Sequence, residues 1–117
     1  MTITAPHRMS VWHHRLAAVV CCCVWSSHGG AQEPAEFRGA NLMLGEQLIA
    51  RHACASCHAS RVGGDGSAIY RPQGRINTAG RLHNMVDLCS VELKLALFPD
   101  EIAAMAAVLN RDHYRFK

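Results

Sequence analysis

Apolar residues recur at helical spacing in three parts of the chain. Between residues 41 and 51, spacings of i, i+4 and i+7 predict a short helix whose apolar residues are Leu42, Leu44, Leu48 and Ile49. From Arg81 onward, a second stripe at i, i+3, i+4, i+7 and i+11 comprises Leu82, Met85, Val86, Cys89 and Leu93. Pro99, Asp100 and Glu101 suit the first turn of a third helix. The inner face of this last helix comprises Ile102, Met105, Ala106 and Leu109.

Residues 61–80, between these helices, contain few apolar side chains. Glycine and proline interrupt them repeatedly, at Gly63, Gly64, Gly66, Pro72, Gly74 and Gly80. A loop of this length in a small domain is usually functional or packs on a ligand. Neither strands nor internal repeats are indicated. The sequence therefore predicts an all-α domain of about three to four helices with a long central loop.

The first part of the chain has the order of a secretory signal peptide. Basic residues such as Arg8 and Arg15 precede an apolar run, Leu16–Trp25, and small residues follow it up to Ala31. Because that run is too short to span a bilayer as a helix, an uncleaved membrane anchor is the less favoured alternative. We expect a signal peptide over 1–31, a flexible N-terminal arm over 32–40 and one domain over 41–117, located in the periplasm.

Removing this leader changes the composition. Of the twelve basic residues, Arg8 and Arg15 leave, so ten remain against nine acidic residues, a net charge of about +1. That balance gives no indication of nucleic-acid binding. Three cysteines remain, Cys54, Cys57 and Cys89, and an odd number does not make a disulfide framework. So small a domain buries little apolar surface, so we expect a stabilising metal, disulfide or large cofactor.

The residues Cys54-Ala55-Ser56-Cys57-His58 fit the pattern for covalent attachment of haem c. Two cysteines three positions apart can each form a thioether to one vinyl group of the same haem, and His58 can then bind the iron. Three alternatives are weighed against this. A thiol redox motif would need a βαβ context, a zinc site would need Cys89 and a histidine as further ligands, and the two cysteines could simply form a disulfide. The expected cofactor is one covalent haem c.

With this motif, the sequence resembles the small bacterial monohaem c-type cytochromes, the class I-like cytochrome c domain. The resemblance runs from about Leu42 to the C-terminus and rests on Gly45-Glu46-Gln47-Leu48, on the cysteine motif and on the helix after Phe98-Pro99. It implies that the first and last helices cross closely at Gly45. It also implies that a proline carbonyl, for which Pro72 is the candidate, accepts a hydrogen bond from Nδ1 of His58.

The sixth ligand of the iron is where the chain departs from this family. A typical member supplies methionine from a loop before the last helix, but residues 94–99 contain none. Met85 is the first candidate, followed by His83 and Met105, with Cys89 or a vacant position as further alternatives. Methionine at helical spacing is also a common core residue. In the long loop, Tyr70, Arg71 and Arg75 are either contacts for the haem propionates or solvated residues.

The leading hypothesis for function is periplasmic electron transfer through one haem that cycles between Fe(II) and Fe(III). Its partners would be other redox proteins, met transiently, with no nucleic acid and no membrane contact except through an uncleaved leader. No catalytic constellation is recognised, so an enzyme is not predicted. The alternatives are a protein that binds a gas or another small ligand at an open sixth position, and a haem relay subunit of a larger redox enzyme.

Overall fold

The computed structural model describes residues 2 and 32–117, and the signal peptide predicted over 1–31 otherwise lies outside the described part. The described residues contain helices and no strands, which confirms the all-α prediction. The elements are η1 (Ala35–Phe37), α1 (Leu42–Arg51), α2 (Cys54–Val62), η2 (Ser67–Ile69), α3 (Ala79–Glu92), α4 (Pro99–Leu109) and a π-helical turn, η3 (Asn110–Tyr114). None of the described helices combines the length and apolar character needed to cross a membrane.

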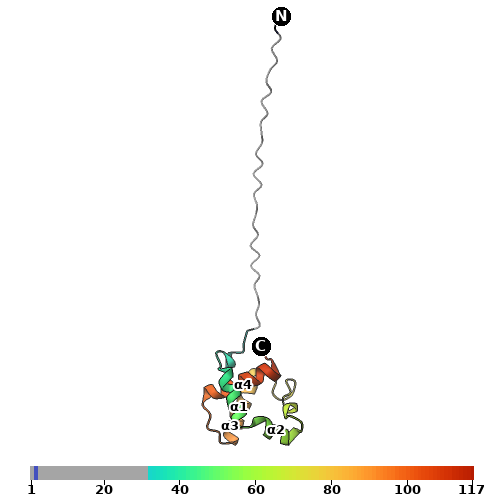
Figure 1. The fold of residues 1–117 in the computed structure, drawn as a ribbon, viewed down its shortest axis with the longest axis vertical. Coiled ribbons are helices and arrows are strands. Elements are labelled where there is room, and N and C mark those ends of the chain that lie inside the picture. Colours follow the sequence, from blue (N-terminus) through green and yellow to red (C-terminus); the bar gives the residue numbers. More distant parts are fainter. Residues whose placement is uncertain (1, 3–31) are drawn as a thin grey trace.

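Helices α1 and α4 cross at Gly45, and this crossing forms the centre of the fold (Figure 1). A Cβ atom on Gly45 would lie only 2.6 Å from the carbonyl carbon of Ala104 and 2.8 Å from Cγ2 of Val108. Only glycine lets the two backbones approach this closely. The close helix contact expected at Gly45 is therefore confirmed.

The hydrophobic core lies around this crossing, between α1, α3 and α4. Its most buried side chains include Phe37 and Leu48, each 1% exposed, together with Leu82, Val86, Ile102 and Met105. Phe37 comes from the segment that we expected to be a flexible arm. The structure instead packs η1 on α4 and α3 through this aromatic ring. The physical reason is the large apolar area of phenylalanine, which outweighs the polar character of its neighbours.

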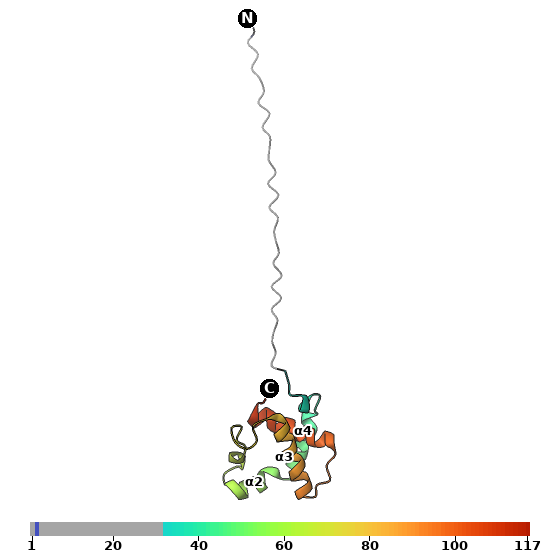
Figure 2. The same cartoon turned by 180° about the vertical axis from the view of Figure 1, so that it is seen from behind.

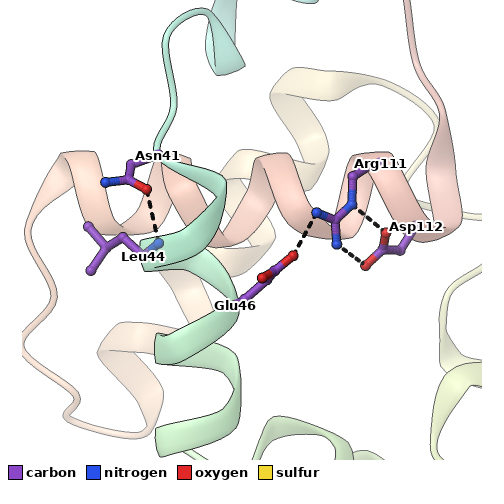
Figure 3. A network of polar contacts seen from close by, with 5 residues as sticks. All are labelled: Asn41, Leu44, Glu46, Arg111 and Asp112. Carbon is purple, nitrogen blue, oxygen red and sulfur yellow. Dashed lines mark hydrogen bonds and ion pairs between the residues drawn. The ribbon is translucent and has the colours of Figure 1, made fainter.

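Polar contacts fix the two ends of the crossing (Figure 3). The side chain of Asn41 caps α1 by accepting a hydrogen bond of 3.1 Å from the backbone N–H of Leu44. Beyond the end of α4, the guanidinium of Arg111 contacts Glu46 of α1 at 2.7 Å and Asp112 at 2.6 Å. These side chains are about half exposed, so solvent screens both pairs, and the pair with Glu46 orients the two helices more than it stabilises them.

The middle of the chain differs most from the sequence prediction. Helix α2 begins at Cys54 itself, and it lies at the end of the domain away from the C-terminus (Figures 1 and 2). It takes up the first residues of the predicted loop, so the connection to α3 runs only from Gly63 to Thr78 and includes the short turn η2. Helix α3 starts at Ala79, two residues earlier than expected, because Oγ1 of Thr78 caps it by accepting from the N–H of Arg81 at 3.2 Å.

Candidate functional site

Helix α2 carries the three residues singled out from the sequence. Ala53 has a left-handed backbone, with φ 51°, and this turn directs α2 away from the end of α1. Cys54, Cys57 and His58 occupy positions i, i+3 and i+4, so they share one face of the helix. None of the nine residues of α2 is buried. The helix packs on α1 and η2 and leaves its cysteine-bearing face toward a cavity.

That cavity has a volume of about 550 Å³ and is lined by all three motif residues. Helices α1, α2, α3 and α4 and the loops between them all contribute to its wall. The wall is mostly apolar; its aliphatic members are Ile49, Val62, Ile69, Ile76, Leu82, Val86, Leu93, Leu95, Leu97 and Leu109. Both its size and its lining match sites for cofactors and drug-sized ligands, which occupy roughly 300–1,000 Å³.

The structure bears on the alternatives to a haem site. Cys54, Cys57 and Cys89 are free thiols, so the disulfide alternative is not formed. Among the described residues, no group of three or more His, Cys, Asp or Glu side chains is placed to hold a metal ion. The zinc alternative therefore lacks its ligand set. Redox motifs lower the pKa of a thiol, whereas burial raises the pKa of Cys54, and the strands of a βαβ unit are missing from residues 32–117.

His58 is held by a tyrosine from the central loop. Its Nδ1 and the hydroxyl of Tyr70 are hydrogen-bonded at 2.9 Å, and the two rings meet edge to face with centroids 5.3 Å apart. We expected the carbonyl of Pro72 in this place, so the structure corrects that assignment to Tyr70. Burial and the nearby charge of Arg61 lower the pKa of His58. Both effects favour the neutral imidazole, which is the state that binds metals.

Gly66 holds the loop against the back of α2. A Cβ atom there would lie 2.7 Å from the carbonyl oxygen of Ala55 and 2.8 Å from Cβ of His58, and the residue has φ 83°. The turn is closed by Asp65, whose Oδ1 accepts hydrogen bonds from the backbone N–H and the hydroxyl of Ser67 at 2.9 and 2.6 Å. The glycine-rich part of the loop therefore supports the backbone that carries His58.

The structure distinguishes the residues that were candidates for a second metal ligand. Met85, Met105 and Cys89 all line the cavity, but His83 does not. Met105 is 4% exposed and part of the α4 core, whereas Met85 is 39% exposed at the cavity wall. Arg71 and Arg75 also line the cavity, which places both where they can meet an anionic group of a ligand.

No protein-family model, curated protein or solved structure matches this chain. The class that the fold and site define is thus a small all-helical domain with a cysteine-and-histidine helix facing a large apolar cavity.

Proposed function

We propose that this protein is a monohaem c-type cytochrome that transfers electrons in the periplasm. Haem would be attached at Cys54 and Cys57, with its iron bound by His58. One observation carries the proposal: the attachment motif lies on a helix with no buried residue and faces a mostly apolar cavity of about 550 Å³. When bound, haem supplies an iron that cycles between Fe(II) and Fe(III).

The residues present fit such a cofactor. Two thiols on one helix face, three positions apart, are available for thioether bonds at one edge of the cavity. The aliphatic walls from α3 and α4 suit a large flat apolar ring and exclude water from it. Arg71 and Arg75 suit the carboxylates of such a ring, since guanidinium binds carboxylate with two parallel hydrogen bonds.

The other residues would contribute to electron transfer by holding the haem ligand in position. The loop around Gly66 and Tyr70 would hold His58 in its orientation. Transfer of an electron requires no substrate pocket. With a net charge of about +1 for residues 32–117, the domain exerts little long-range electrostatic attraction, which suits brief contacts with more than one redox partner.

Covalent attachment is tested by replacing cysteines one at a time. We expect the exported wild-type protein to keep its haem on a denaturing gel and to gain the mass of one haem. The variants Cys54→Ala and Cys57→Ala should each lose one thioether, and the double variant should lose covalent haem completely. Cys89→Ala is the matched control, because Cys89 lines the same cavity outside the motif, and it should keep the haem. A wild-type protein without covalent haem would refute the proposal.

The sixth position of the iron decides between electron transfer and binding of a gas. Met85 is the proposed ligand because it lies at the cavity wall without being part of the buried core. We expect reduced wild-type protein to bind CO slowly and Met85→Ala to bind it rapidly. Met43→Ala is the control, since Met43 is 68% exposed on α1 and outside the cavity. Equally rapid binding by the wild type would favour the gas-binding alternative.

A further inference from the structure

Tyr70 connects His58 to the C-terminal part of the chain. On one side its hydroxyl is 2.9 Å from Nδ1 of His58. On the other side its ring stacks on His113, with centroids 4.2 Å apart and an angle of 21° between the planes. The ring of Tyr114 meets it edge to face at 6.1 Å. Tyr70 is therefore held between the proposed haem ligand and the turn that follows α4.

The segment that holds Tyr70 is itself fixed. The side chain of Asn110 bonds the backbone of Phe116 twice: its Oδ1 accepts from the N–H at 2.8 Å and its Nδ2 donates to the carbonyl at 3.2 Å. The ring of Tyr114 is buried and packs on Phe116 at 5.4 Å. Tyr70 thus has little freedom to move away from His58.

The chemistry of this contact follows from the two ring nitrogens of histidine. With Nδ1 engaged by Tyr70, Nε2 remains as the nitrogen available to a metal. An imidazole that binds a metal through Nε2 carries its proton on Nδ1 and donates it to a neighbouring acceptor. A tyrosine hydroxyl can accept that bond.

We propose that Tyr70 is the positioning residue of His58, held in place by the turn of residues 110–116. The inference rests on the proposed function, in which His58 binds haem iron. A hydrogen bond from Nδ1–H fixes the orientation of the ring and raises its basicity as a ligand. A more basic ligand stabilises Fe(III) over Fe(II), so this contact lowers the reduction potential.

The test compares two variants, each of which removes one tyrosine hydroxyl from the same cluster of aromatic rings. We expect Tyr70→Phe to shift the reduction potential of the haem-loaded protein to a more positive value and to change the EPR g values of the oxidised iron. Tyr114→Phe is the matched control: it also loses the hydroxyl of a tyrosine in this group of rings, but that hydroxyl does not bond His58. Its potential should stay at that of the wild type.

If Tyr70→Phe does not acquire covalent haem, a second variant still tests the inference. His113→Ala leaves the hydroxyl of Tyr70 but removes the ring stacked on it, so the potential should move in the same direction by a smaller amount. Equal reduction potentials for the wild type, Tyr70→Phe and Tyr114→Phe, all with covalent haem, would overturn this inference and leave the proposed function standing. Absence of covalent haem from the wild type would instead overturn the proposed function.

Discussion

Without haem, the chain is expected to show no cooperative thermal unfolding transition. The cavity of about 550 Å³ has mostly apolar walls, and without haem these walls stay exposed to water. Each Å² of apolar surface left exposed loses roughly 25 cal/mol of stabilisation. The whole stability of a folded domain is only about 5–15 kcal/mol. Helix α2 does little to compensate for this loss, since none of its residues is fully buried.

The measurement uses the double variant Cys54→Ala/Cys57→Ala, purified free of haem and heated while its far-ultraviolet circular dichroism is followed. We expect weak helical signal and a shallow, non-cooperative change with temperature. The Cys89→Ala protein with its haem serves as the reference and should melt cooperatively. A sharp transition in the haem-free variant would show that the helices fold around the cavity unaided, contrary to this expectation.

The second large effect is expected at the helix crossing. Gly45→Ala should destabilise the haem-loaded protein by about 1–3 kcal/mol, the usual cost of inserting a methyl group into a packed core. The added carbon would meet the backbone of Ala104, which cannot rotate away as a side chain can. Gly45→Val should destabilise the protein more than Gly45→Ala and should reduce the yield of folded protein. Chemical denaturation followed by circular dichroism measures both losses.

Gly80 provides the matched control for this experiment. It also lies in a helix, α3, and a Cβ atom there would approach only Oε1 of Glu36, at 3.3 Å. That carboxylate is the far end of a flexible side chain and can move. Because alanine has a higher helix propensity than glycine, Gly80→Ala should leave stability unchanged or raise it by up to about 1 kcal/mol. Equal losses of stability from Gly45→Ala and Gly80→Ala would contradict the close contact of α1 and α4 at Gly45.

Sequence patterns predicted the helices that have an apolar face toward the core. The stripe from Leu82 to Leu93 and the start at Pro99 both correspond to helices of the structure, α3 and α4. Helix α2 was missed for a physical reason. Its residues form no apolar stripe because the helix faces a cavity instead of the core, and its start depends on a left-handed turn at Ala53, a residue that gives no sign of one.

The surroundings of His58 were only partly predictable. The motif itself identifies His58, but its partner depends on how a loop of irregular backbone folds, and spacing along the chain does not determine that. Tyr70 was considered only as a contact for haem carboxylates, and Pro72 was preferred on the strength of a resemblance. Position along a helix is more informative: residues 83 and 85 point roughly 160° apart around the helix axis. This separation explains why Met85 lines the cavity and His83 does not.

The crossing of α1 and α4 also affects the order in which the domain assembles. Gly45 and Ala104 are far apart along the chain, and the cysteine motif lies between them. Synthesis from the N-terminus therefore completes the segment that carries Cys54 and Cys57 before α4 exists. Since contacts between distant segments form late, we expect the α1–α4 crossing to be among the last contacts of the domain to form.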